Sequence, residues 1–209
     1  MSLPNNISLL SYKWREVYNS ILRLKFYTYL EITNSKLIKD LDCEFNSFAK
    51  KYVCTQDTNL RFFGGNTLIG FSYLVLVRMF EILNKYFDKA QIDNLFKTSD
   101  WKAIGINQFS DLSKKYKINI DVLVETKRNG TKYYDSDTDK LAFLMRKIRN
   151  AVSHYRYEHP DMLSIRLTDV NGQGQVELDL TMPYADFINF CADMGCIIND
   201  TLIKNHFKK

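Results

Sequence analysis

Residues 138–158 read TDKLAFLMRKIRNAVSHYRYE, and this stretch decides how the rest of the chain is interpreted. Its apolar side chains recur in steps of three and four residues, which is the spacing of a helix with one face against a core. They are Leu141, Leu144, Met145, Ile148, Val152 and Tyr155. The residue before Pro160 resists helical backbone angles, so the helix should end there. The stretch predicts a core-facing helix late in the chain.

The sequence before this helix predicts further helices. Residues 8–39 and 42–52 carry apolar side chains at helical spacing, and residues 67–88 are apolar nearly all round, as in a helix at the centre of a bundle. Residues 91–117 predict one or two short helices, whereas the β-branched stretch 118–124 is ambiguous between strand and helix. Only 8 Gly and 3 Pro interrupt the chain, which also favours long helices.

The pattern changes after Pro160 to an alternation with a period of two. Apolar and polar residues alternate on both sides of the turn Asn171-Gly172-Gln173-Gly174, which predicts a β-hairpin at about 164–181. The apolar members are Ile165, Leu167, Val170, Val176, Leu178 and Leu180. A closing helix should follow Pro183 and run to about His206. The expected fold is therefore mostly α: one helical domain over residues 1–209, elaborated by the hairpin.

The charge of the chain points to a polyanionic partner. The formal net charge is +5 and the sequence pI is near 8.9. Clustered Lys and Arg gain affinity for nucleic acid by releasing phosphate counterions. A lysine-rich composition can equally serve solubility alone. Charge by itself leaves these two interpretations open.

The cysteines and the apolar segments indicate a cytoplasmic protein. The four cysteines, Cys43, Cys54, Cys191 and Cys196, form no C-x-x-C pair and no metal-ligand spacing with histidine, so free buried thiols are expected. The N-terminus lacks the pattern of a secretory signal. The most apolar stretch, 67–77, is too short to cross a bilayer and predicts a core helix. We therefore expect no membrane segment, no metal and no cofactor.

Polar residues gather on the side of the 138–158 helix opposite its apolar stripe. At 100° per residue they share one broad face, with Arg149 at its edge. The members of the face are Arg146, Asn150, Ser153, His154 and Tyr157. Asn150 and His154 are four residues apart and adjacent on the helix, whereas Arg149 and His154 diverge. Only the long arginine side chain, or a symmetry-related partner helix, could bring both to one ligand.

These residue types suit phosphate-ester chemistry. Arginine donates two hydrogen bonds to phosphoryl oxygens and stabilises developing charge. Histidine exchanges a proton near neutral pH, and asparagine can orient it or donate to the phosphate. RNA supplies its own nucleophile, the 2′-hydroxyl, so the chemistry needs no metal. The competing interpretation is a chance combination that leaves an exposed histidine at the negative end of a helix dipole.

The segment Arg149-Asn150-Ala151-Val152-Ser153-His154 resembles the R-x4-H signature of the HEPN superfamily. The resemblance implies a helical bundle, commonly a homodimer with the two motifs facing each other. It also implies metal-independent RNA cleavage that leaves a 2′,3′-cyclic phosphate, in toxin–antitoxin, phage-defence or RNA-processing settings. By position, Arg149 and His154 would be catalytic and Asn150 their polar support. Arg146, Ser153 and Tyr157 would contact substrate, and a cognate antitoxin protein would be a possible partner.

One position departs from the toxin branch that is silenced by modification of a tyrosine. That tyrosine stands two residues after the histidine, where this chain has Arg156 between Tyr155 and Tyr157. A neighbouring tyrosine would have to serve instead. Phe143, on the polar face, predicts either a covering partner or contact with the chain's own hairpin.

Two other functions stay open at this stage. The first is a non-catalytic HEPN-like module that binds RNA, a nucleotide or a protein. The second is a helical interaction protein in which the motif is a coincidence. A His154 side chain buried and hydrogen-bonded inside its own bundle would favour the coincidence.

Overall fold

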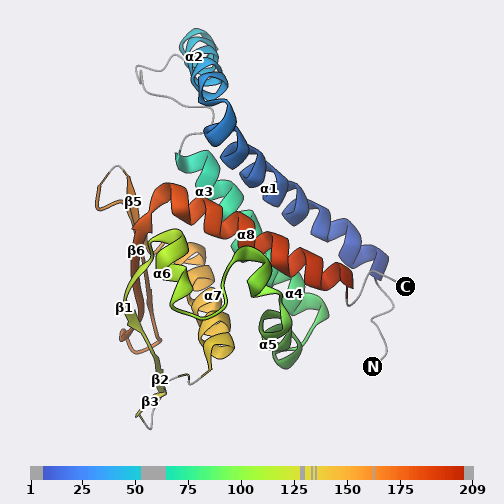
Figure 1. Cartoon of the computed structure of the whole chain (residues 1–209), viewed down its shortest axis with the longest axis vertical. Coiled ribbons are helices and arrows are strands. Elements are labelled where there is room, and N and C mark those ends of the chain that lie inside the picture. Colours follow the sequence, from blue (N-terminus) through green and yellow to red (C-terminus); the bar gives the residue numbers. More distant parts are fainter. Residues whose placement is uncertain are drawn as a thin grey trace.

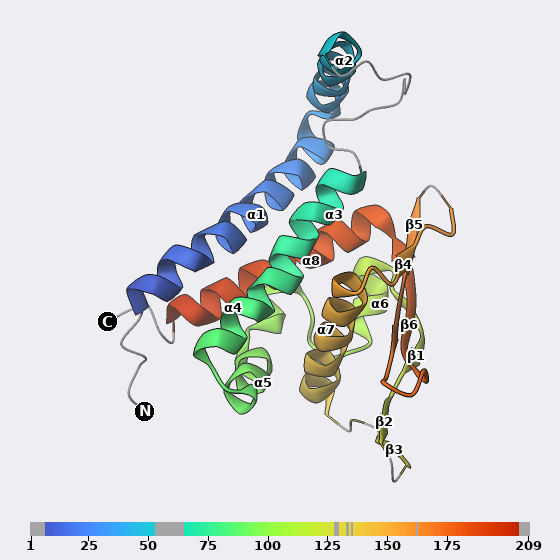
Figure 2. The same ribbon diagram turned by 180° about the vertical axis from the view of Figure 1, so that it is seen from behind.

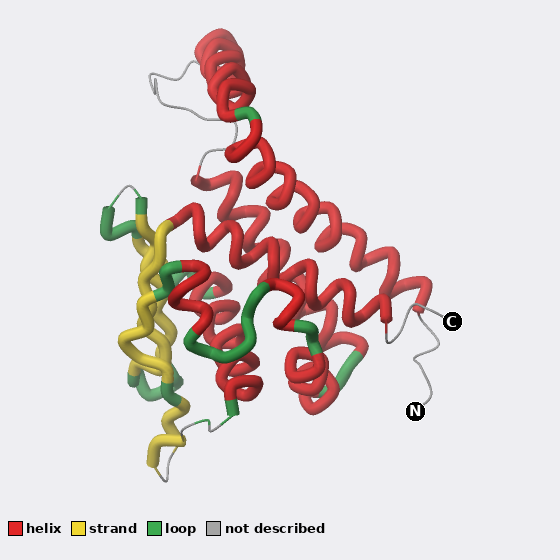
Figure 3. The backbone as a smooth tube through the Cα atoms, viewed as in Figure 1, coloured by secondary structure: helices red, strands yellow, loops and turns green. Residues whose placement is uncertain are grey.

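A computed structural model describes residues 7–52, 65–127, 130–132, 134, 136–161 and 163–204. It shows a body of helices with a small sheet on one side, and the strands are gathered at one edge of the helical body in Figure 3. The helices are α1 (Ile7–Thr33), α2 (Ser35–Tyr52), α3 (Gly65–Tyr73), the π-helical turn η1 (Leu74–Arg78), α4 (Met79–Tyr86), α5 (Lys89–Thr98), the 3-10 helix η2 (Trp101–Ile104), α6 (Asp111–Tyr116), α7 (Asp137–Ser153) and α8 (Tyr184–Leu202). The mostly helical prediction is confirmed.

The strands form two antiparallel sheets. They are β1 (Asn119–Leu123), β2 (Glu125–Lys127), β3 (Gly130–Lys132), β4 (Tyr157–Glu158), β5 (Ser164–Val170) and β6 (Val176–Pro183). The larger sheet has the order β1-β6-β5-β4, and β2 pairs with β3 as a separate two-stranded sheet. The predicted hairpin is β5–β6, and the ambiguous stretch 118–124 is an edge strand of the same sheet.

Helix α8 and the continuous run α3–η1–α4 lie at the centre of the helical body, with α1 packed across both (Figures 1 and 2). The crossing of α1 and α8 is very close, because a Cβ added at Gly195 would lie 2.5 Å from Ile21 Cγ1. The indole of Trp14 donates to Asn199 Oδ1 over 3.0 Å at the same interface. A glycine on α8 thus lets the two helices share one dense core.

The apolar run at the centre covers nearly all of residues 67–88, the stretch predicted to be apolar nearly all round. The span Thr67–Tyr86 is long and apolar enough to cross a membrane by length and composition alone, and half of it is buried in the fold. It contacts α1, α7 and α8, and Val75, Leu76 and Met79 have no exposed surface. These contacts are those of the core helix of a folded domain.

Two local predictions differ from the structure. The helix expected over 8–39 ends at Thr33, because the Asn34 side chain accepts the backbone N–H of Leu37 over 3.2 Å and starts α2. The cysteines were expected to be buried, yet Cys43 is exposed, while Cys191 is buried and Cys196 is half-buried. Cys54 lies outside the described residues.

Candidate functional site

Helix α7 carries the motif, and its two ends are fixed in different ways. At the start, the Ser136 hydroxyl accepts the backbone N–H of Asp139 over 3.1 Å, which is an N-cap. Along its length, Leu144, Ile148 and Val152 are buried against the core. The apolar stripe predicted from sequence therefore sets the rotation of the helix and, with it, the direction of the motif residues.

The helix ends at Ser153, and the chain then turns sharply rather than continuing to residue 158. The backbone N–H of Arg156 donates to Ala151 O over 2.8 Å, and that of Tyr155 donates to Val152 O over 3.2 Å. This pair of bonds is a Schellman motif, which needs a left-handed residue at its first position outside the helix. Tyr155, with φ of 54°, occupies that position instead of glycine. The strained turn makes His154 the C-cap of α7 and leads the chain through Arg156 into β4.

Arg149 and Asn150 contact each other at the last turns of α7. Arg149 Nη1 donates to Asn150 Oδ1 over 2.9 Å, and the guanidinium carbon lies 5.8 Å from the centre of the Phe80 ring. The Nε atom of Arg149 is buried and has no hydrogen-bond partner in the described part of the chain. An unsatisfied buried donor costs about 1–3 kcal/mol unless a water or a ligand reaches it.

Asp169 of β5 holds the asparagine from the other side. Its Oδ2 atom accepts from Asn150 Nδ2 over 3.3 Å and from Lys147 Nζ over 3.0 Å. Its Oδ1 atom accepts from Arg156 Nη1 over 2.9 Å. Only 2% of Asp169 is exposed. A buried carboxylate with three donors is rigid, so the hairpin fixes the orientation of Asn150 and, through it, of Arg149.

A bulge in the hairpin adds a second acid to this network. The register shifts between Asp169 and Val170, which pair with Leu178 and Val176, so Glu177 has no partner opposite it. Glu177 turns inward and forms a short ion pair with Lys147, while Val176 is 43% exposed. The alternation of Val176 with Leu178 and Leu180 therefore does not make Val176 a core residue, because the bulge turns Glu177 inward in its place.

Sequence reasoning missed Asp169, although a signal for it was present. Asp169 continues the inward series of Ile165 and Leu167, so the alternation places a charge on the apolar face of the hairpin. Lys147 likewise lies on α7 directly beside Ile148 and is 7% exposed. Two opposite charges on two core-facing surfaces predict a buried pair. The rule that buried charges are paired connects them.

His154 lies apart from this network. Its backbone N–H donates to Asn150 O over 3.0 Å, whereas its side chain is exposed and makes no hydrogen bond or ion pair within the described residues. The buried histidine that would favour a coincidental motif is not what the structure shows. The imidazole is available to a ligand or to a second subunit.

The other three predicted site residues are placed differently from one another. Ser153 is half-buried beside His154. Arg146 lies two turns earlier, where its Nη2 atom donates to Tyr134 Oη over 3.4 Å. Tyr157 was expected on the helix, but the Schellman turn places it in β4, opposite Leu167. The single helical face that was to hold all of them does not extend past His154.

Phe143 is covered by its own chain. It is 1% exposed and stacks on Tyr134 with 4.6 Å between ring centres. Burial, with a hydrogen bond to Glu125, raises the pKa of Tyr134 to about 12, so its phenol stays protonated. The covering residue comes from the segment before α7, so neither a partner nor the 164–181 hairpin is needed. Phe143 consequently gives no support for a dimer.

A hollow of about 290 Å³ opens beside the end of α7. Helix α3 contributes one wall, and the residues around the Schellman turn contribute the other. The lining residues are Ile69, Gly70, Tyr73, Val152, Tyr155 and Tyr157. A Cβ added at Gly70 would meet no atom within 4 Å, so the wall at α3 is open. Three tyrosines around a cavity next to His154 form a surface on which flat rings can stack.

No group of three or more His, Cys, Asp or Glu side chains that could hold a metal ion is found over the described ranges between residues 7 and 204.

The fold and the motif define a class, that of HEPN domains, and the family comparison makes it specific. The chain belongs to the family described as HEPN pEK499 p136, whose profile matches residues 5–205. No curated protein and no solved structure matches the chain. The family match covers nearly the whole chain and includes α7, the hairpin and α8. HEPN domains are commonly ribonucleases that dimerise and bind RNA.

Proposed function

We propose that this HEPN domain is a metal-independent endoribonuclease whose reaction takes place at the C-terminal end of α7. The observation that carries the proposal is an exposed His154 at the end of the helix whose arginine–asparagine pair is held in place by a buried carboxylate. Preorganised donors near a free proton-transfer group are what phosphate-ester cleavage needs.

In the proposed reaction the RNA 2′-hydroxyl attacks the neighbouring phosphorus. His154 exchanges a proton with the 2′-hydroxyl or with the leaving 5′-oxygen, and the products are a 2′,3′-cyclic phosphate and a 5′-hydroxyl. Arg149 stabilises the negative charge that develops on the phosphoryl oxygens. Asn150 positions the arginine, and Ser153 lies close enough in the chain to contact substrate.

The hollow beside His154 suits the base next to the scissile phosphate. Tyr155 is 76% exposed, and Tyr73 and Tyr157 line the same cavity. Aromatic side chains bind single-stranded RNA by stacking on its bases, largely without regard to sequence. We therefore assign base binding to this hollow. We assign Arg146 a contact with a phosphate farther from the cleaved bond.

Within one chain the Arg149 guanidinium faces Asn150 and Phe80 rather than the histidine. A homodimer through the motif face would bring the Arg149 of one copy toward the His154 of the other. A C2 interface uses the same surface on both copies, which suits an exposed helix end. We propose this dimer, acting in the cytoplasm in a toxin–antitoxin or phage-defence system, with an antitoxin protein as a possible further partner.

The test is a cleavage assay in EDTA. Wild type, His154→Ala and His159→Ala would be incubated with mixed cellular RNA, and the fragment ends analysed. His159 is the control histidine because it is exposed and lies outside the motif; its ring bonds Ser164 O and contacts the edges of Tyr157 and Tyr184. Cyclic-phosphate ends from wild type and His159→Ala, but not from His154→Ala, are expected. Loss of helicity or of the dimer in His154→Ala would count against a catalytic role.

A non-catalytic RNA-binding module is the second candidate. The observation in its favour is that no side chain among the described residues hydrogen-bonds the His154 ring and so orients it. This candidate predicts RNA binding without cleavage, and equal affinity near neutral pH for wild type and His154→Gln. Cleavage by wild type would eliminate it.

A further inference from the structure

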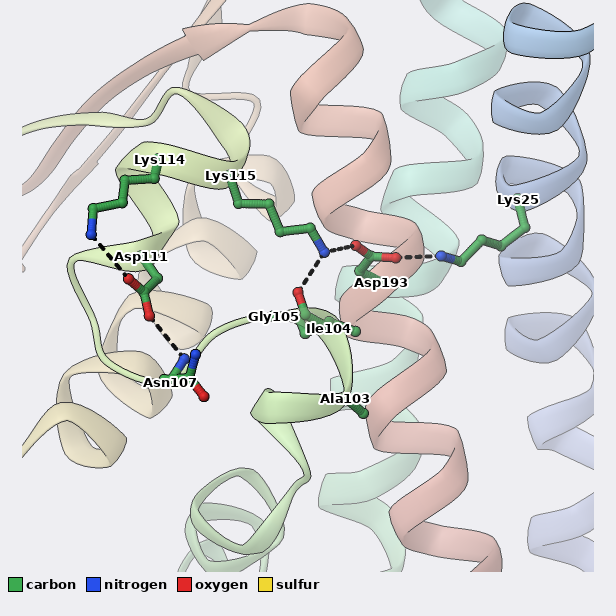
Figure 4. Close-up of a pocket in the computed structure, with 9 residues that line it drawn as sticks. All are labelled: Lys25, Ala103, Ile104, Gly105, Asn107, Asp111, Lys114, Lys115 and Asp193. Carbon is green, nitrogen blue, oxygen red and sulfur yellow. Dashed lines mark hydrogen bonds and ion pairs between the residues drawn. The ribbon is translucent and has the colours of Figure 1, made fainter.

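A second hollow lies on another part of the molecule, between α1, η2, α6 and α8 (Figure 4). Its volume is about 580 Å³, within the range of small-molecule sites. Helix α6 lies in front of α7 in Figure 1, whereas α7 lies in front of α6 in Figure 2. We call this hollow the lysine pocket, after its polar lining of Lys25, Lys114, Lys115, Asn107, Asp111 and Asp193.

Asp193 of α8 forms the floor of the lysine pocket. Two lysines point at it from opposite sides in Figure 4, Lys115 over 2.7 Å and Lys25 in a short ion pair. Buried Tyr116 donates to the same carboxylate over 2.7 Å. Asp193 itself is 9% exposed. Burial alone raises the pKa of this carboxyl, but the bonds from Lys115, Lys25 and Tyr116 together hold it below its ordinary value. The acid is therefore charged at neutral pH.

The second acid of the pocket is already engaged. One oxygen of Asp111 accepts the backbone N–H groups of Asn107 and Gln108 over 3.0 and 3.1 Å. The other oxygen lies 3.5 Å from Lys114 Nζ. Three lysines thus face two carboxylates, and one of those carboxylates is largely used by backbone donors. The pocket carries a surplus of positive charge.

The lysines also have donors left over. An ammonium group has three N–H bonds. Lys115 uses two of them, on Asp193 and on Ile104 O, whereas Lys25 uses one and Lys114 at most one. Five N–H groups on these three described side chains have no acceptor among the described residues. The three lysines line one cavity, Lys25 and Lys115 on opposite sides of Asp193 and Lys114 beside Asp111 (Figure 4), so the donors that remain are available to an anion with several oxygens.

From this geometry we infer that the lysine pocket binds a phosphoryl group, at a site separate from the RNA-cleaving end of α7. Lysine binds phosphate as a point charge with three donors, and does not need the planar match of an arginine. No aromatic side chain is among the described residues that line the pocket, so recognition falls on the phosphate rather than on a base. The group can come from a free polyphosphate ligand or from an RNA strand.

Calorimetric titration separates these sources. The probes are inorganic tripolyphosphate, ATP and a short single-stranded RNA, added to wild type, Lys25→Gln, Lys114→Gln and the control Lys102→Gln. Lys102 is an exposed lysine on η2, adjacent in sequence to the pocket but outside its lining. Each pocket variant should weaken binding by about tenfold, the size expected for one charge-assisted hydrogen bond, and the control should bind like wild type.

The results expected are saturable binding of tripolyphosphate and ATP that depends on Lys25 and Lys114, which indicates a free ligand. Binding of the RNA alone with the same dependence would assign the phosphoryl group to a strand, and also supports the site. No saturable binding of any probe would overturn the inference. Equally weakened probe binding in Lys102→Gln would overturn it as well, because it would show that binding follows the net charge of the protein rather than the pocket. Circular dichroism of Lys114→Gln, whose lysine is 74% exposed, checks the fold.

Discussion

Asp169 and Asp193 are both buried carboxylates that bind lysine, yet their surroundings differ. The Lys147 side chain at Asp169 is 9% exposed, whereas the Lys25 and Lys115 side chains at Asp193 are 43% and 34% exposed. At Asp169 two acids, with Glu177, balance two bases, Lys147 and Arg156. At Asp193 one acid faces two lysines.

The comparison shows how charge balance separates a structural network from a binding surface. A closed, neutral cluster offers no surplus charge to a further ion, and the Asp169 network holds Asn150 through the hydrogen bond from its amide. A half-open cluster with surplus positive charge can take up an anion at little cost in desolvation. The two acids should therefore respond differently to the same substitution.

The largest effect is expected for Asp169→Ala. This change leaves buried Lys147 with one acid and removes an acceptor from Asn150 and Arg156. Removing one partner of a buried ion pair costs about 3–5 kcal/mol, and here two bases, Lys147 and Arg156, are left with the single acid Glu177. Chemical denaturation at neutral pH would measure it. Asp121→Ala, at an exposed position of β1, is the control and should change stability by no more than about 0.5 kcal/mol. Equal losses of stability in Asp169→Ala and Asp121→Ala would show that the buried network around Asp169 adds no stability.

An intermediate effect is expected for Asp193→Asn, about 1–2 kcal/mol, since Lys25 and Lys115 can turn to water and the amide oxygen still accepts from Tyr116. The pKa of Asp193 is lowered from 3.8 in the folded state. Its contribution to stability is therefore complete above pH 3.8 and is lost as the pH falls through the lower, folded pKa.

Denaturation curves of wild type and Asp193→Asn, recorded from neutral pH down to about pH 2, would measure this contribution. The gap between them should be constant near neutral pH and close in acid. A gap that persists at the acid end would show that packing, rather than charge, makes Asp193 important.

The smallest effect is expected at the turn that leads to Arg156. Tyr155 has a left-handed backbone, which costs a residue other than glycine about 1 kcal/mol, so Tyr155→Gly should stabilise the fold by about that amount. If Tyr155 also stacks on a base, the same variant should be more stable and cleave RNA more slowly. Thermal melting with a cleavage assay measures both, and Ser153→Gly, inside the helix, should instead be destabilised.

The long periodic elements could be predicted from the sequence because each buries one regular face. The stripe on α7 and the alternation in β5 needed no tertiary information. The end of α7 could not be predicted, because a tyrosine takes the place where glycine is expected. The bulge that turns Glu177 inward likewise depends on the register between strands, which alternation alone does not reveal. The motif residues could be found in the sequence. Asp169, the acid that holds Asn150, lies in the hairpin, for which the sequence predicts no function.

The bulged hairpin has a consequence for the modularity of this domain. A hairpin that only decorated the bundle could be shortened or lost among relatives at small cost. Here β5 and β6 carry the two acids that neutralise Lys147. Deleting them would leave a cation enclosed in the apolar interior, so lineages that discard the hairpin should also replace the lysine by an uncharged residue. Lys147, Asp169 and Glu177 are expected to be gained and lost together.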